Sequence, residues 1–131
     1  MSNPNQILRS VYSAFAAGDL PALLAHLHPE IRWNEAEGFP LADRNPYVGC
    51  DAIVQGVFVR IAEEWDDFQV EVGELAGSGD VVTVFGRYKA RHKRTRKVLD
   101  VQCAHTWWLA NGKLVRFQQM VDTAGVAAAR A

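Results

Sequence analysis

The spacing of apolar residues along the chain changes near residue 68. Before that point apolar positions recur every three or four residues, and after it they recur at every second residue. The first period is typical of amphipathic helices and the second of half-buried strands. Helices followed by a strand meander predict an α+β fold, with helices on one face of an antiparallel sheet, in a single domain spanning residues 1–131.

Three helices are predicted before the change of period. Asn3-Pro4 provides an N-cap and a proline at the first helical position, and Gly18 suits the end of that helix. Asp19 can cap a second helix, which His28-Pro29 would end. Asp51 can cap a third, with one apolar stripe made by Val54, Phe58, Ile61 and Trp65. Between the second and third helices, the alternation of Ile31, Trp33 and Glu35 predicts a short strand, followed by a loop over 36–49.

Four strands are predicted after the change of period, at about 68–76, 81–91, 98–109 and 113–122. Asn111-Gly112 favours a two-residue type I′ turn, which places Ala110 opposite Lys113. Counting back from the turn pairs His105 with Gln118, Cys103 with Met120 and Val101 with Asp122. Directly opposed residues share one face of a sheet, so these six should line the same side.

The turn between the second and third strands is less well determined. The run Lys89-Ala-Arg-His-Lys-Arg-Thr-Arg-Lys97 is strongly basic and does not select a turn type. A two-residue turn at Arg94-Thr95 would place Tyr88 opposite Val101, giving a row Tyr88–Val101–Asp122. The basic run itself favours a solvated hairpin tip over a nucleic-acid or phosphate contact, because no groove-reading helix or stacking platform accompanies it.

The other face of the sheet is also substantially apolar. In the same register it carries Trp108, Phe117, Val115, Val121, Thr106, Ala104, Gln102 and Gln119. Monomers rarely expose a contiguous apolar patch of several hundred Å². This face therefore predicts a homodimer.

Composition narrows the functional classes. The 131 residues are 49% hydrophobic and carry a formal net charge of −1, which gives no general attraction to nucleic acid or membrane. No apolar run approaches the roughly 20 residues that cross a bilayer, and the first residues lack a signal-peptide pattern. Cys50 and Cys103 lack metal-ligand spacing and are expected to be thiols in a cytoplasmic protein. No phosphate-binding loop, nucleophile elbow or metal-ligand cluster occurs, so no cofactor or metal is expected.

Several short segments, in order, resemble a known family. They are Ala17-Gly-Asp-Leu20, His28-Pro-Glu-Ile-Arg-Trp33, Tyr47-Val-Gly49 with Asp51-Ala-Ile53, Asn111-Gly-Lys-Leu-Val115 and Val121-Asp-Thr123. The chain resembles SnoaL-like proteins of the nuclear transport factor 2-like superfamily, which contains polyketide cyclases and relatives of ketosteroid isomerase. The resemblance implies a cone-shaped fold, with a curved sheet around the helices and an apolar chamber, and homodimers packed through the outer sheet face. It also implies that Asp122 matches a position where catalytic members place an acid–base carboxylate.

The candidate chemistry centres on that carboxylate. Asp122 would abstract a proton next to a carbonyl, while His105, Tyr88 or Gln118 would hydrogen-bond the developing enolate. The alternatives are a structural cap for Asp122, a satisfied core histidine for His105 and a packing role for Tyr88. A His105–Asp122 dyad is disfavoured, since four residues of strand separate them by roughly 13 Å. The expected chamber wall comprises Trp33, Glu35, Phe15, Phe58, Val101, Cys103, Gln118 and Met120. Glu35 could act as a second acid, but a solvated strand end is the favoured interpretation.

Three functions remain open from the sequence. The first is a cofactor-free isomerase, cyclase or lyase acting on a small hydrophobic carbonyl compound. The second is a non-catalytic, dimeric ligand-binding protein, and the third is an interaction module whose basic hairpin meets an acidic partner.

Overall fold

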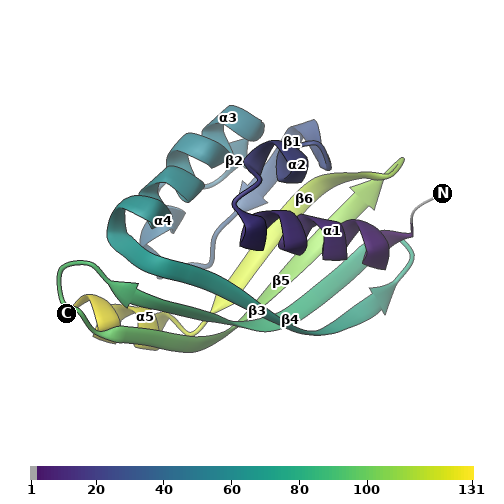
Figure 1. Ribbon diagram of the computed structural model, residues 1–131. Helices are drawn as coiled ribbons and strands as arrows, with labels where there is room; N and C mark the ends of the chain where they lie inside the picture. The colour runs from purple at the N-terminus through teal and green to yellow at the C-terminus, as the bar shows by residue number, and fades with distance from the viewer. Residues whose placement is uncertain (1–2) are drawn as a thin grey trace.

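The computed structural model describes residues 3–131, which form helices packed against one curved sheet (Figure 1). The helical elements are α1 (Pro4–Ala17), α2 (Leu20–Leu24), the 3₁₀ helix η1 (Pro40–Arg44), α3 (Cys50–Ile53), the π-helix η2 (Val54–Phe58), α4 (Val59–Glu64) and α5 (Thr123–Arg130). The strands are β1 (Leu27–Asn34), β2 (Tyr47–Val48), β3 (Trp65–Ser78), β4 (Val81–His92), β5 (Val98–Ala110) and β6 (Lys113–Val121).

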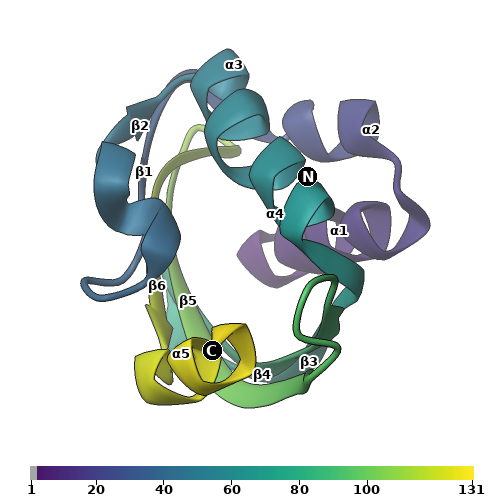
Figure 2. The same ribbon diagram turned by 90° about the vertical axis from the view of Figure 1, so that its left-hand side faces the viewer.

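The sheet has six strands in the order β2-β1-β6-β5-β4-β3. β1 runs parallel to β6, whereas the other neighbouring pairs are antiparallel. Figure 2 shows the sheet curving around α1 and the α3–α4 segment, with α5 at one end of the curved sheet. This arrangement is the α+β cone that the family resemblance implied, but the sheet is mixed and not wholly antiparallel as predicted, because β1 pairs with β6 in parallel.

The helix ends follow the local sequence in part. Asn3 caps α1, its side chain accepting from the Gln6 N–H, and Gly18 ends the helix with a φ of 69°. Asp19 caps α2 as predicted, but α2 ends at Leu24, and β1 already begins at Leu27 and contains His28-Pro29. The third helical segment starts at Cys50 rather than after an Asp51 cap, and Trp65 is the first residue of β3 rather than helical.

One of the two predicted registers is confirmed. β4 and β5 pair Tyr88 with Val101, as a two-residue turn at Arg94-Thr95 requires. The β5–β6 register is wrong by one residue beyond the turn. Asn111 and Gly112 do take positive φ angles, but the pairing shifts between Trp108 and Leu109, so that His105 lies opposite Gln119 and not Gln118. A bulge of this kind adds one residue to one strand and reverses the facing of every later side chain.

The bulge exchanges residues between the two faces, since Phe117 and Gln119 were predicted on the outer face and Gln118 and Met120 in the chamber. Phe117 and Gln119 are buried on the inner face, while Gln118 and Met120 face outward and Met120 is 59% exposed. Asp122 lies beyond the end of β6, where it caps α5 by accepting from the Gly125 N–H at 3.0 Å. The row Tyr88–Val101–Asp122 therefore does not form, and Asp122 has the structural role that was its alternative interpretation.

The basic hairpin is only partly solvated. His92 is buried, and Thr95 donates to the carbonyl oxygen of Ala129 at 2.6 Å, while the Lys97 ammonium donates to that of Ala131 at 2.8 Å. The turn between β4 and β5 thus holds the carboxyl end of α5, where the helix dipole favours positive charge.

The interior is formed mainly by the inner sheet face and one face of α1. Its largest fully buried side chains include Trp107 and Phe117. Cys50 and Cys103 are free thiols. Among residues 3–131, no helix is long and apolar enough to cross a membrane.

Candidate functional site

A cavity of about 50 Å³ lies between the helices and the inner sheet face. Of the predicted wall residues, Phe15, Trp33, Glu35 and Phe58 line it, together with two of the predicted catalytic residues, Tyr88 and His105. The remaining lining is Val11, Tyr12, Leu23, Val57, Ile61, Phe68, Val70, Trp107, Phe117 and Gln119. Val101 and Cys103 are buried elsewhere in the core, and Gln118, Met120 and Asp122 do not reach the cavity.

His105 is the centre of a buried hydrogen-bond network. Its Nδ1 is 2.6 Å from the hydroxyl of Tyr12, and its Nε2 bonds the hydroxyl of Tyr88. Tyr12 also accepts from the indole N–H of Trp107 at 3.0 Å, and Tyr88 accepts from the amide of Gln119 at 2.9 Å. Both hydroxyl oxygens therefore already accept one hydrogen bond from a donor other than histidine.

Burial keeps this network neutral. Desolvation lowers the pKa of His105 to about 3 and raises the pKa values of Tyr12 and Tyr88 well above 10. A neutral imidazole has one N–H and one acceptor nitrogen. The tyrosine beside the acceptor nitrogen donates to it, while the tyrosine beside the N–H accepts and keeps its own hydroxyl hydrogen free. One hydroxyl of the pair is thus available to a ligand in the cavity.

The hydrogen bonds of Gln119 show that the Tyr88 hydroxyl oxygen is the acceptor in the bond between these two side chains. Its Oε1 accepts from the backbone N–H of Ala36 at 3.1 Å, which leaves the amide nitrogen to donate to Tyr88. The bulge in the β5–β6 pair is what turns Gln119 inward. Sequence reasoning missed this residue because it used the register of an unbulged hairpin.

Glu35 is the buried carboxyl group of the cavity. It follows β1 directly, and Asn45 fixes its backbone by accepting from the Glu35 N–H at 2.9 Å and donating to the Glu35 carbonyl at 2.8 Å. Its Oε1 accepts a long bond of 3.4 Å from the Trp33 indole, and its Oε2 is buried without a hydrogen-bond partner among residues 3–131. Burial raises the pKa of Glu35 to about 7 against the smaller lowering effect of the Trp33 bond.

Aromatic rings form most of the cavity wall. Trp33 stacks on Phe117 with ring centroids 3.8 Å apart and meets Trp107 edge-on at 5.5 Å. Phe58 reaches Trp33 from the π-helix η2, a rare element that is frequent at functional sites. Gly56 is required in η2, because a Cβ there would lie 2.3 Å from the Tyr47 ring.

The site thus combines a carboxyl group that titrates near neutral pH with neutral hydroxyl donors in an apolar surrounding. Sequence reasoning placed Glu35 on the chamber wall but favoured a solvated strand end over a second acid, which is wrong because Glu35 is buried. It missed Tyr12. Tyr12 lies between Val11 and Phe15 on α1, and this place near the apolar stripe was the available signal. No group of three or more His, Cys, Asp or Glu side chains suited to a metal ion occurs within residues 3–131.

Comparison with known proteins agrees with this architecture. An NTF2-like protein from Burkholderia thailandensis E264 is 39% identical, with a TM-score of 0.94 over 100% of this chain and 99% of that one. An NTF2-like protein of unknown function from Burkholderia pseudomallei K96243 is 28% identical, with a TM-score of 0.88 over 98% of each chain. A protein with a ketosteroid isomerase-like fold from Catenulispora acidiphila DSM 44928, solved in complex with trimethylamine, is 17% identical with a TM-score of 0.80, over 98% of this chain and 93% of that one.

These structures define an NTF2-like fold. The SnoaL-like domain family matches residues 8–117, and the chain belongs to that family. A search of curated proteins finds no match.

Proposed function

We propose that this protein is a cofactor-free isomerase, cyclase or lyase that performs acid–base chemistry on a small apolar carbonyl compound. The observation that carries the proposal is Glu35, a carboxyl group buried in an apolar cavity. One of its oxygens has no hydrogen-bond partner in the described part of the chain, and burial raises its pKa to about 7. A base with a pKa near the working pH is the most effective proton acceptor. Glu35 therefore takes the role of base that the sequence analysis gave to Asp122, because Asp122 is exposed and caps α5.

The reaction begins with transfer of one proton. The Glu35 carboxylate removes a hydrogen from the carbon next to the carbonyl, and the electron pair of that C–H bond moves into the carbonyl to give an enolate. The free hydroxyl of Tyr12 or Tyr88 donates to the enolate oxygen. Return of the proton from Glu35 to a different carbon completes an isomerisation. In a cyclisation the enolate carbon attacks a second carbonyl carbon of the same molecule, the C=O π pair moves to that oxygen, and Glu35 returns its proton to this oxygen.

The pairing of a carboxylate base with hydroxyl donors in an apolar site has a precedent in ketosteroid isomerase chemistry. Within the fold, relatives include a putative SnoaL-like polyketide cyclase from Jannaschia sp. CCS1 and a putative hydroxylase from Streptomyces galilaeus, at 18% and 16% identity. At these identities they support the fold, and the chemistry of this chain is argued from Glu35 and the His105 network.

Exchange of α-hydrogen for deuterium tests the proposal without knowledge of the natural substrate. Incubation of 2-butanone in D₂O with the wild-type protein should give exchange, followed by NMR, above that of buffer. Glu35→Gln keeps the size of the side chain but removes the base, and should lower the exchange rate by about 100-fold or more. Equal rates for the variant and the wild type would exclude Glu35 as the base.

A second candidate function is binding without catalysis. The aromatic rings beside a buried carboxyl group suit a small ammonium ion, which is attracted by both. The Catenulispora acidiphila protein solved with trimethylamine supports this candidate. Calorimetry with trimethylammonium should then show binding that Glu35→Gln abolishes, in a protein that exchanges no ketone hydrogens.

We also propose a homodimer built on the outer sheet face, with its residues revised. Phe117 and Gln119 are buried inside the cone, and the guanidinium of Arg116 lies 4.2 Å from the centre of the Trp108 ring. The exposed apolar row is instead Phe85–Ala104–Met120, three residues in register on β4, β5 and β6. Phe85 is 47% exposed and Met120 59%, and a two-fold axis would bring this row against its own copy.

A further inference from the structure

A groove of about 360 Å³ adjoins the cavity from outside. The two share Phe15, Phe58, Ile61 and Phe68, all partly buried. The ring of Phe15 lies 6.0 Å from that of Phe58 and 6.3 Å from that of Phe68, measured between centroids. Three phenylalanine rings in contact thus form a narrow partition between cavity and groove.

A second cleft, of about 410 Å³, lies between η1, α4, the β4–β5 turn and α5. Lys93 lines both the groove and this cleft. Its backbone N–H donates to the carbonyl oxygen of Glu64 at 3.0 Å, which holds the turn against the end of α4. Lys93 therefore stands at the junction of the two spaces.

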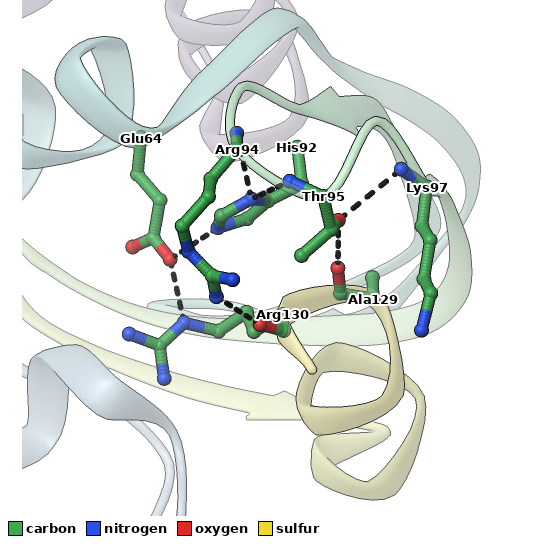
Figure 3. Close-up of polar contacts among 7 residues, drawn as sticks. All are labelled: Glu64, His92, Arg94, Thr95, Lys97, Ala129 and Arg130. Atoms are coloured by element: carbon green, nitrogen blue, oxygen red, sulfur yellow. Dashed lines mark hydrogen bonds and ion pairs between the residues drawn. The ribbon is translucent and has the colours of Figure 1, made fainter.

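The charges that surround Lys93 are largely paired with one another. Glu64 accepts from Arg130 at 2.5 Å and from His92 at 2.8 Å (Figure 3). Asp66 pairs with Arg96 at 3.0 Å. The ammonium of Lys93 has no ion pair or hydrogen bond within residues 3–131.

Arg94 adds a second cation beside Lys93. One of its terminal nitrogens bonds the carbonyl oxygen of Arg130, and Figure 3 shows its side chain between Glu64 and Arg130. Two exposed carboxylates, Asp67 in the groove and Glu63 in the cleft, repel an anion and so partly offset its attraction to these cations. The attraction for an anion is therefore local to Lys93 and Arg94 and does not extend over the surface.

The size of the cavity limits which part of a long ligand it can hold. A space of about 50 Å³ holds only the head of a molecule, so a longer ligand must pass the phenylalanine partition into the groove. We propose that the site takes a carbonyl head in the cavity, an apolar chain in the groove and an anionic group, carboxylate or phosphate, at Lys93. The assignment of the carbonyl head depends on the proposed function. The assignment of the chain and of the anionic group depends on the residues shared by the cavity and the groove and on Lys93. Lys93 is thus a specificity-determining residue.

Oxo acids of increasing length, with their methyl esters, are suitable probes: 4-oxopentanoate, 6-oxoheptanoate and 8-oxononanoate. Quenching of tryptophan fluorescence reports binding, because Trp33 and Trp107 line the cavity and Trp65 lines the groove. Affinity of the esters should rise with length, by up to about fourfold for each methylene buried. The longest acid should bind roughly three- to fivefold more tightly than its ester, the scale of an exposed ion pair, and salt should reduce this ratio.

Two lysine variants decide the assignment. Lys93→Gln should bring the acid-to-ester ratio of the longest probe to about one. Lys113→Gln makes the same change in net charge on the β5–β6 turn, where its ammonium binds the carbonyl of Ala25, and should keep the ratio. A ratio of one in the wild type, a ratio unchanged by Lys93→Gln, or equal loss in both variants would overturn the proposal.

Failure of the catalytic proposal would be seen separately. If the wild type exchanges no α-hydrogen but the acid-to-ester ratio depends on Lys93, the extended binding site stands and the acid–base function falls. If Glu35→Gln stops exchange while chain length and Lys93 have no effect on affinity, the reverse holds.

Discussion

Glu35 and His105 share one apolar cavity, and burial moves their pKa values in opposite directions. The pKa of Glu35 rises from 4.5 to about 7, whereas that of His105 falls from 6.5 to about 3. Desolvation disfavours the charged form of each, so both groups are largely neutral between about pH 3 and pH 7. The site consequently contains a weak acid and a neutral imidazole, rather than the ion pair that these two residue types often form.

These shifts predict a pH dependence of folding stability. Between pH 4.5 and 7 the unfolded chain loses the Glu35 proton that the folded protein retains, so this group lowers the free energy of unfolding as pH rises. Between pH 6.5 and 3 the unfolded chain binds a His105 proton that the folded protein excludes, so that contribution falls as pH drops. In the overlap of the two windows the slopes oppose each other, and the wild type should show a shallow dependence.

Urea denaturation of Glu35→Gln and wild type at several pH values separates the two effects. The free energy of unfolding of the variant, relative to wild type, should increase by about 3 kcal/mol between pH 4.5 and 7, from 1.36 kcal/mol for each pKa unit. A difference that stays constant over this range would contradict the raised pKa.

The β-bulge in β6, which places one extra residue in that strand, caused the largest error of the sequence prediction, the register of β6 against β5. The change of period, the first helix with its caps, the four long strands and the Tyr88–Val101 pairing follow from residue patterns. The shift between Trp108 and Leu109 does not, because Asn111-Gly112 selects the turn type and not the regularity of the strands beyond it. Gln118 and Met120 were therefore exchanged with Phe117 and Gln119.

The candidate site was predictable to a similar extent. His105 and Tyr88 were assigned to one chamber from strand alternation and pairing, and Trp33 and Glu35 were added from the family resemblance; all four line the cavity. The burial of Glu35 was not predictable, because it depends on Asn45 in segment 36–49, which was predicted as a loop but contains η1 and β2. The prediction of Asp122 as the base failed because an aspartate at the end of a strand can equally serve as a helix cap.

Replacement of the two aspartate caps tests the revised role of Asp122. Asp122→Ala removes the bond to the Gly125 N–H and should cost about 1 kcal/mol of stability, measured by thermal or urea unfolding. Exchange of ketone hydrogens should stay within about twofold of wild type. Asp19→Ala, which removes the corresponding cap of α2, is the matched control. A selective loss of exchange in Asp122→Ala would restore Asp122 as the base.

In the whole molecule, the curved sheet separates two apolar surfaces, one inside the cone and one outside it. The inner face supplies the cavity, and the outer face presents Phe85, Ala104 and Met120 in one row. The bulge is responsible for this division, because it turns Phe117 inward and Met120 outward.

Sedimentation at micromolar concentration tests the outer face. The wild type should sediment at twice the 14.6 kDa chain mass, and Met120→Glu should shift it toward monomer with little loss of stability, because a 59% exposed side chain is altered. Phe117→Glu should instead unfold the protein, because that ring is buried. A monomeric wild type would contradict the proposed dimer and leave the cavity unaffected.

The protonation of Glu35 itself is the most direct test of the acid–base account. In protein labelled with ¹³C at glutamate side-chain carboxyl carbons, the one resonance missing from Glu35→Gln identifies the group, and its chemical shift can be followed against pH. We predict a midpoint of about 7 for Glu35. A midpoint in the ordinary range for glutamate, near 4.3, would show that the carboxyl group is solvated or paired, and would contradict its role as the base of this cavity.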